Sequence, residues 1–259
     1  MYAILSILVI VALVLTLSNS TEPFEQHPEK RRAMVIVEPR AHKSLEYVLH
    51  NFHQRMPPSY DLYIFHGETN ADFARRAARD IRGRRIRFVR LATKNLTPSE
   101  YNTLLTTEWF YDQINAEHIL VFQTDTVMCK NSPHNIQQFE RYGYIGCPYN
   151  DVIGKGKHWG ADHSFYGVGG LSMRRKSEAL RCIRSERRKG EGEDVFFSDC
   201  VEKGYGKKPE SAAIMQAFCT QQHFRGKPLG VHKPSQLVHR DRAALTNHCP
   251  EVRAIAPWK

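Results

Sequence analysis

Short uninterrupted apolar runs that alternate with helical stretches constrain the fold of this chain more than any other feature. Four such runs lie at residues 34–37, 62–65, 86–91 and 119–122, of which 86–91 has mixed polarity. Runs of this kind are typical of strands buried on both faces. Between the third and fourth runs, Thr97 has the spacing of a helix cap, because Pro98 suits the first turn and Glu100 completes a capping box. The pattern predicts an α/β, Rossmann-like fold with a mainly parallel central sheet and helices on both faces.

Polar side chains follow three of the four runs, at Glu38, His66 and Asp125. Ligands bind outside the carboxyl ends of the strands in open α/β sheets, so we expect these three side chains to line one crevice. Asp125 is placed to hold a divalent metal against a substrate diphosphate, and a helix cap or turn is an equally good interpretation of its position.

The second half of the chain offers three more candidate groups. Three glycines in residues 167–170 run into an alternating stretch, which allows a backbone to approach a ligand closely before a strand begins. Glu193 and Asp194 open an amphipathic stretch, either as helix caps or as a general base facing the crevice. His232 can bring an imidazole to the same metal, with Lys233 near the phosphates, although one His among 13 more often has a structural role.

The amino terminus predicts a membrane anchor. Residues 2–17 carry no charge and are rich in Ile, Leu and Val. No basic residue precedes this run and residues 18–20 form only a loose cleavage site, which favours an uncleaved anchor at 1–20 over a signal peptide. Residues 21–33 are the expected stalk, and 34–259 the single folded domain. The protein is therefore expected to be a single-pass membrane protein, with the secretory-pathway lumen and the cytosolic face both open as the location of that domain.

Charge and cysteine content narrow the function only slightly. The 37 Lys and Arg exceed the 27 Asp and Glu by 10, which favours anionic partners. Eight arginines between residues 75 and 90 fit a solvated surface better than a nucleic-acid site, because no aromatics are interleaved with them, so nucleic acid is not expected. The six cysteines are at least 18 residues apart, which argues against structural zinc and leaves disulfides and buried thiols open.

Seven short motifs occur in the same order as in a little-characterised glycosyltransferase-like domain family. They are residues 35–40, 95–97 with 101–105, 122–126, 144–146, 169–174, 193–198 and 231–234. The chain resembles this family over about residues 33–235. The resemblance implies the GT-A fold of nucleotide-diphospho-sugar transferases, a nucleotide-sugar-binding α/β sandwich.

The resemblance also implies roles for individual residues. Residues 123–125 resemble the metal-binding Asp-x-Asp motif with Gln123 in place of the first Asp, so that Asp125 and His232 would hold Mn²⁺ or Mg²⁺. Asp194 matches the catalytic base of inverting members, and Glu193 beside it would be an acceptor or sugar contact. The expected nucleotide-sugar contacts are Glu38, Arg40, His66, Gly67, Asn102, Gln123, Thr124, Gly169, Gly170 and Lys233.

The function implied is that of a metal-dependent glycosyltransferase. It would move a sugar, with inversion, from a nucleotide-diphosphate sugar to a hydroxyl of a glycan, protein or small-molecule acceptor. The alternative is a catalytically degenerate GT-A scaffold that binds nucleotide or glycan without turnover, since Gln123 replaces a carboxylate.

Overall fold

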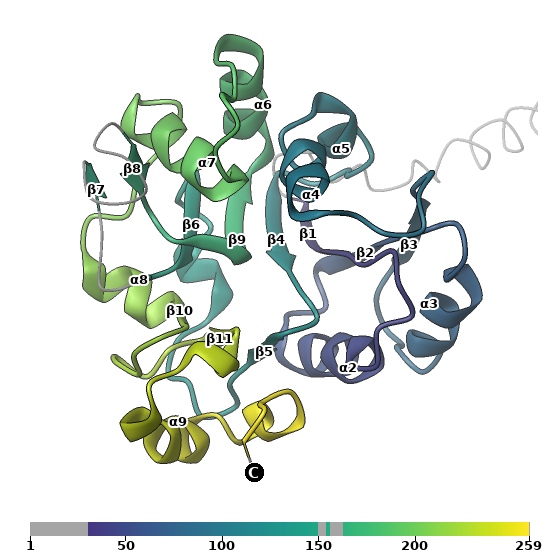
Figure 1. The fold of residues 1–259 in the computed structure, drawn as a ribbon, viewed down its shortest axis with the longest axis vertical. Coiled ribbons are helices and arrows are strands. Elements are labelled where there is room, and N and C mark those ends of the chain that lie inside the picture. Colours follow the sequence, from purple (N-terminus) through teal and green to yellow (C-terminus); the bar gives the residue numbers. More distant parts are fainter. Residues whose placement is uncertain (1–30, 150–153, 156–162, 259) are drawn as a thin grey trace, which may run out of the picture.

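A six-stranded sheet forms the centre of the protein (Figure 1). The computed structural model describes residues 31–149, 154–155 and 163–258. The strands lie in the order β3-β2-β1-β4-β9-β6, and β9 runs antiparallel to both of its neighbours. Their bounds are β1 (Arg32–Val37), β2 (Tyr60–His66), β3 (Ile86–Arg90), β4 (His118–Phe122), β6 (Tyr144–Cys147) and β9 (Val168–Arg175). The predicted α/β architecture with a mainly parallel sheet is confirmed, and β1 begins two residues before the expected domain boundary at residue 34.

Helices cover both faces of this sheet (Figure 1). Their bounds are α2 (Leu45–Arg55), α3 (Ala71–Ala77), α4 (Pro98–Leu104), α5 (Glu108–Asp112), α6 (Lys176–Ser185), α7 (Glu193–Glu202) and α8 (Ala212–Phe218). On one face Phe52 of α2 stacks on Phe122 of β4, with ring centroids 4.0 Å apart. On the other face Phe110 of α5 packs on Phe65 of β2 at 5.0 Å. The capping box expected at Thr97 is present at the start of α4.

A smaller sheet continues from the end of β4. The chain turns through residues 123–125 into β5 (Thr126–Met128), which pairs antiparallel with β11 (Gly230–His232), and β10 (Cys219–Thr220) completes the order β10-β11-β5. A second apolar cluster lies under this sheet, against α9 (Arg242–His248) and η5 (Pro250–Ala254). The remaining short elements are β7 (Gly154–Lys155), β8 (Ser164–Phe165), η2 (Ile136–Phe139), η3 (Pro234–Gln236) and η4 (His239–Asp241).

All six cysteines are paired in disulfides, which decides between the two alternatives that the sequence leaves open. The pairs are Cys129–Cys249, Cys147–Cys219 and Cys182–Cys200. The first joins the end of β5 to the segment after α9, the second joins β6 to the smaller sheet, and the third joins α6 to α7. The disulfides therefore tie the carboxyl-terminal elements to both sheets.

The expected membrane anchor at residues 1–20 lies outside the described residues. Within residues 31–149, 154–155 and 163–258, no helix has both the length and the apolar character needed to cross a bilayer.

Candidate functional site

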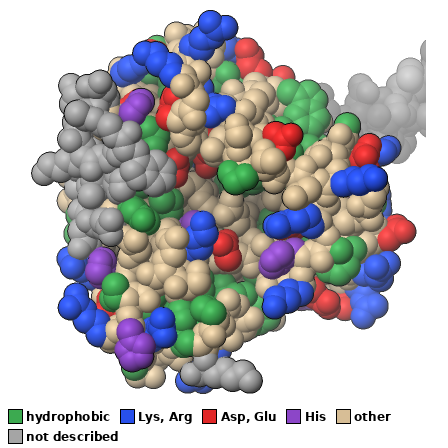
Figure 2. Space-filling model, in the orientation of Figure 1, with side chains coloured by type: hydrophobic (Ala, Val, Ile, Leu, Met, Phe, Trp, Pro, Cys, Tyr) green, Lys and Arg blue, Asp and Glu red, His purple; other side chains and the backbone are tan. Residues whose placement is uncertain are grey.

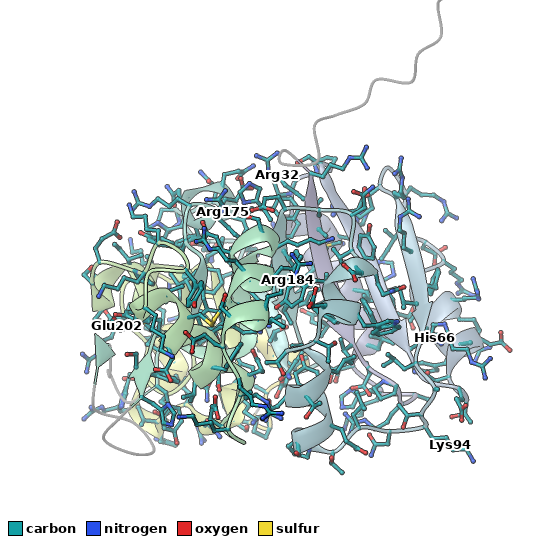
Figure 3. All side chains as sticks on the ribbon, turned by 90° about the horizontal axis from the view of Figure 1, so that it is seen from above. Arg32, His66, Lys94, Arg175, Arg184 and Glu202 are labelled. Carbon is teal, nitrogen blue, oxygen red and sulfur yellow. A yellow bond between two sulfur atoms is a disulfide. The ribbon has the colours of Figure 1, made fainter. Side chains whose placement is uncertain are left out.

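A cavity of about 250 Å³ opens at the carboxyl ends of β1 and β4. The chain order changes direction between these neighbours, and such a switch point is where ligands bind in open α/β sheets. Figure 3 shows Arg32, at the start of β1, and Lys94, after β3, at opposite edges of the molecule, so the carboxyl ends lie on the Lys94 side. The described residues that line the cavity are Val37, Glu38, Arg40, His42, Tyr101, Gln123, Thr124 and Asp125.

Glu38 and Arg40 form one wall of the cavity as an ion pair. Arg40 Nε and Nη2 donate to Glu38 Oε1 and Oε2 at 2.8 and 2.9 Å, and the Arg40 backbone N–H donates to Oε1 at 3.0 Å. Thr124 Oγ1 lies 3.5 Å from Glu38 Oε2. Because the Glu38 carboxylate is buried and neutralised by this bidentate pair, it gives the wall a fixed shape and leaves the exposed guanidinium edge of Arg40 for a ligand.

The loops after β1 and β2 are locked together by a residue that sequence reasoning missed. Asn70 is buried and donates from Nδ2 to the carbonyls of Glu38 and Arg40 at 2.9 and 2.8 Å, while its Oδ1 accepts from the Gly67 N–H at 2.7 Å. A Cβ at Gly67 would overlap the carbonyl oxygens of Pro39, after β1, and Thr93, after β3, so a side chain does not fit at this position. His66, expected in the crevice, is buried with its Nδ1 2.8 Å from the Gly67 carbonyl and is not among the described residues that line the cavity.

The two expected metal ligands, Asp125 and His232, lie next to each other. Asp125 follows β4 and His232 ends β11, and the antiparallel pairing of β11 with β5 places His232 opposite Thr126. The Lys233 N–H also donates to the Asp125 carbonyl at 2.9 Å. As a result His232 Nε2 lies 3.6 Å from Asp125 Oδ1, with the imidazole buried and the carboxylate about one-third exposed (38%).

Hydrogen bonding fixes the protonation of the His232 ring. Its Nδ1 donates to Oε1 of the buried Gln221 at 2.7 Å, so the neutral ring carries its lone pair on Nε2. Burial lowers the pKa of His232 to about 4, despite the nearby Asp125 carboxylate, so the ring stays neutral at physiological pH. Nε2 is therefore a buried acceptor that receives no hydrogen bond from any described residue, and it faces a carboxylate oxygen that is also an acceptor.

The separation of these two acceptors is short enough for them to share one cation. Metal–oxygen distances for Mg²⁺ are about 2.1 Å, so two ligand atoms on one such ion lie at most about 4.2 Å apart. The observed 3.6 Å is below that limit. Within the described part of the chain, no group of three His, Cys, Asp or Glu is placed to hold a metal, so any further ligands would come from a bound molecule or water.

The glycine pair at the start of β9 makes room for neighbouring functional groups. A Cβ on Gly170 would overlap the His232 ring at Nε2, and a Cβ on Gly169 would overlap the Glu193 carboxylate. The antiparallel pairing of β9 with β4 brings this strand start beside the turn at residues 123–125. Gly169 and Gly170 are therefore glycines because side chains from α7 and β11 pack directly on them, and neither lines the 250 Å³ cavity.

Glu193 is the buried partner of an arginine. Arg174 of β9 is fully buried and donates from Nη2 to Glu193 Oε2 at 2.6 Å, with its guanidinium stacked over Phe197. Burial raises the pKa of Glu193 to about 7, even though the guanidinium favours the ionised form. One carboxylate oxygen of Glu193 accepts from Arg174 and the other packs against Gly169, so Glu193 supports the start of β9. The acceptor or sugar contact expected for this buried side chain stays a prediction.

Asp194 is the second residue of α7, next to Glu193, at the helix start that the sequence predicts. Its Oδ1 accepts from the Val195 N–H at 2.9 Å, and the Gly169 N–H also bonds to the carboxylate. Burial raises the pKa of Asp194, and these backbone donors partly oppose the shift. The Asp194 carboxylate is therefore held by the Gly169 N–H and is more basic than that of an exposed Asp. It lies beside the start of β9, where the His232 ring packs on Gly170.

The remaining expected nucleotide-sugar contacts differ in whether they line the 250 Å³ cavity. Gln123 and Thr124 line the cavity, whereas Asn102 on α4 and the exposed Lys233 are not among its described lining residues. Lys233 has a left-handed backbone conformation with φ of 48°, and its N–H donates to the Asp125 carbonyl. Tyr101, one residue before Asn102, lines the cavity instead, beside Gln123.

The arginine-rich stretch from 75 to 90 does not form one surface. Arg84 is half-buried and donates to the carbonyls of Tyr60, His53 and Met56, which makes it structural. Arg75 lies over the Phe88 ring at 4.8 Å. The face in Figure 2 likewise shows basic, acidic and histidine side chains interspersed, with no continuous hydrophobic patch.

Comparisons with known proteins assign a family. The family model described as "Protein of unknown function (DUF5672)" matches residues 85–232, more than half of the chain. The chain belongs to this family. The DUF5672 match runs from β3 to β11, so it contains Asp125, Asp194 and His232 and leaves β1 and β2 outside.

No curated protein matches the chain. A solved structure of S. aureus TarS 1–349 in complex with UDP-GlcNAc is similar at 11% identity with a TM-score of 0.44. The similarity covers 69% of this chain and 54% of that one, so this chain spans about half of the TarS fragment.

Proposed function

We propose that this protein is a metal-dependent glycosyltransferase of GT-A type, which moves a sugar from a nucleotide-diphosphate sugar to an acceptor hydroxyl. One observation carries the proposal: four motifs that are far apart in the sequence converge on one strand end. Asp125 faces His232, the ring of His232 packs on Gly170, and Asp194 is held by Gly169. Each of these motifs has a role in the family that the sequence resembles, and the roles require them to be neighbours.

The cavity beside Asp125 suits the nucleotide end of a donor. Its walls supply the guanidinium of Arg40, the imidazole of His42 and the hydroxyl of Thr124, which can pair with ribose, base or phosphate oxygens. Asp125 lines the same cavity, and its carboxylate lies 3.6 Å from His232 Nε2. A donor bound there would have its base and ribose in the cavity and its diphosphate at the Asp125–His232 pair.

The residues present fit a hard or borderline divalent cation such as Mn²⁺ or Mg²⁺. His232 Nε2 and Asp125 Oδ1 would hold it, because they are two acceptors without a proton between them. When bound, such a cation offsets the negative charge of a diphosphate leaving group. Gln221 keeps the Nε2 lone pair available, and Gly170 leaves the space that the ring occupies.

Asp194 is the proposed general base. Its carboxylate takes the proton of the acceptor hydroxyl while the acceptor oxygen forms a bond to the anomeric carbon of the donor. The bond from that carbon to the diphosphate oxygen breaks with its electron pair, which releases a nucleoside diphosphate and inverts the anomeric configuration. The raised pKa of Asp194 makes its carboxylate a stronger base than that of an exposed Asp. Glu193 is a positioning residue, because it packs on Gly169, whose N–H holds Asp194.

A second candidate is a GT-A scaffold that binds a nucleotide or glycan without turnover. It is favoured by Gln123, which lines the cavity where the Asp-x-Asp motif has a carboxylate, and by the absence of a third protein ligand among the described residues. Hydrolysis separates the two candidates, because a transferase releases sugar slowly to water and an inactive scaffold does not.

The test is a thermal-shift screen of the full chain against UDP-, GDP- and CMP-sugars with and without Mn²⁺, followed by hydrolysis assays. We expect a Mn²⁺-dependent shift that Asp125→Ala abolishes, and hydrolysis that Asp194→Asn stops while donor binding stays within twofold of wild type. Asp80→Asn, at an exposed carboxylate after α3, is the matched control. An unchanged shift in Asp125→Ala would contradict the metal assignment, and a wild-type shift without hydrolysis would select the inactive scaffold.

We also propose that the folded domain lies in an oxidising compartment, carried by the amino-terminal anchor as a single-pass protein. Three disulfides in one domain are expected in a secretory lumen or outside the cell and are rare in the cytosol. A maleimide gel-shift on protein extracted under alkylating conditions tests this. No modification before reduction and six added groups after it would support the lumenal placement, and modification before reduction would overturn it.

A further inference from the structure

A second cavity lies far along the chain from the proposed donor site, at the carboxyl-terminal end. It has a volume of about 440 Å³ and is lined by α9 and the residues on either side of it. The lining residues are His239, Arg242, Ala243, Thr246, Asn247, Arg253 and Trp258. None of them lines the cavity at β1 and β4, so the two are separate.

The charged side chains that line this cavity, those of Arg242 and Arg253, are positive. Arg242 and Arg253 make no ion pair with a described residue, and the lining contains no Asp or Glu. The two nearest carboxylates in the sequence are engaged elsewhere. Asp241 accepts from the Phe224 N–H at 3.0 Å, and Glu251 pairs with Arg55 at 3.3 Å. A concave site lined by uncompensated positive charge concentrates field lines and attracts anions.

The lining also offers more hydrogen-bond donors than acceptors. Arg242 stacks over the Trp258 ring at 4.7 Å, which holds the guanidinium in place. Arg242 Nε and Trp258 Nε1 are buried and donate to no described residue. Two side chains of the lining therefore carry N–H groups that have no acceptor among the described residues. By contrast, the cavity of about 630 Å³ beside α7 contains four carboxylates, from Glu186, Glu191, Asp199 and Glu202.

We propose that this cavity binds a sulfate or phosphate ester group carried by a larger organic molecule. The three terminal oxygens of such an ester group can accept from both guanidinium groups at once, whereas the two oxygens of a carboxylate are occupied by a single guanidinium fork. The volume exceeds that of a free ion and lies in the range of sites for small organic molecules. The proposal is independent of the glycosyltransferase assignment, because it shares no residue with that site.

The test is calorimetric titration of the full chain with inorganic sulfate and inorganic phosphate, against sodium chloride at equal ionic strength. We expect saturable binding that Arg253→Gln weakens at least tenfold. Arg253 is exposed, so its substitution leaves the fold intact, and Arg242→Gln provides a second variant from the other wall. Arg240→Gln is the matched control, because Arg240 is exposed on η4, outside the lining, and should bind within twofold of wild type.

Two further arms identify the source of the group. Glucosamine 6-sulfate and glucose 6-phosphate are titrated in the same way, and the tighter ester indicates a sulfated or a phosphorylated partner. Saturable, Arg253-dependent binding of either ester supports the proposal. Heat that follows ionic strength alone, or equal weakening by Arg240→Gln and Arg253→Gln, would overturn it.

Discussion

Gln221 is predicted to control metal binding without touching the metal. Its Oε1 accepts from Nδ1 of His232 at 2.7 Å, which keeps the lone pair of the ring on Nε2. In Gln221→Met that acceptor is lost at similar side-chain volume. The proton then moves to Nε2, where Asp125 Oδ1, only 3.6 Å away, becomes its acceptor. The new hydrogen bond would occupy both proposed ligands at once.

The geometry sets the size of the two expected effects. A buried donor left without an acceptor costs about 1–3 kcal/mol, and the alternative tautomer recovers most of it, so we expect a stability loss of about 1 kcal/mol. For a domain of this size, 1 kcal/mol lowers the melting temperature by about 2–4 °C. Metal affinity should fall by about 10–100-fold, the usual effect of removing a partner that orients a ligand.

The assay is a Mn²⁺ titration followed by electron paramagnetic resonance of the free ion, in the presence of whichever nucleoside diphosphate stabilises the wild-type protein most. Gln236→Met is the matched control, because Gln236 bonds to the other end of the Gln221 amide and does not contact the ring in this network. Nitrogen chemical shifts of His232 report the tautomer directly. Mn²⁺ affinity of Gln221→Met within twofold of wild type would refute the tautomer argument.

Three further outcomes are expected. Gly170→Ala should weaken Mn²⁺-dependent nucleotide binding, because the added Cβ overlaps the imidazole, and equal affinity in the same titration would show that the ring can move aside. The plot of kcat/KM against pH should rise as Asp194 loses its proton; burial raises this pKa, so the rise should lie above the value of about 3.9 for a free Asp, and a rise at or below that value would contradict the role of Asp194. Replacing Cys129 and Cys249 by Ala should lower the unfolding free energy by about 2–5 kcal/mol in denaturant melts, because that disulfide closes a long loop, and an unchanged midpoint would show that the native contacts suffice.

Local patterns were enough to predict the main elements. Uninterrupted apolar runs at 34–37 and 119–122 correspond to β1 and β4 at the centre of the sheet, and the Thr97 capping box starts α4. The placement of Asp125 beside the cavity could be predicted in the same way, because residues that follow central parallel strands lie at the carboxyl edge of the sheet, where the cavity opens.

Long-range partners could not be read from the sequence. Asn70 and Gln221 carry no local pattern, and their importance comes only from the loops and the ring that tertiary structure brings to them. Arg174 sits in an alternating stretch that gives no sign of a buried cation, since only packing pairs it with Glu193. The antiparallel direction of β9 was likewise not predicted, because a strand pattern does not encode its direction.

The antiparallel register of β11 with β5 has a consequence for how this site can change. Positions 125 and 232 are presented to each other by main-chain hydrogen bonds, so their separation does not depend on which side chains they carry. Exchanging the imidazole for a carboxylate would shift the preference from borderline toward harder cations without altering the strand pairing. In the proposed metal site, single substitutions could therefore change the choice of ion while the backbone stays the same.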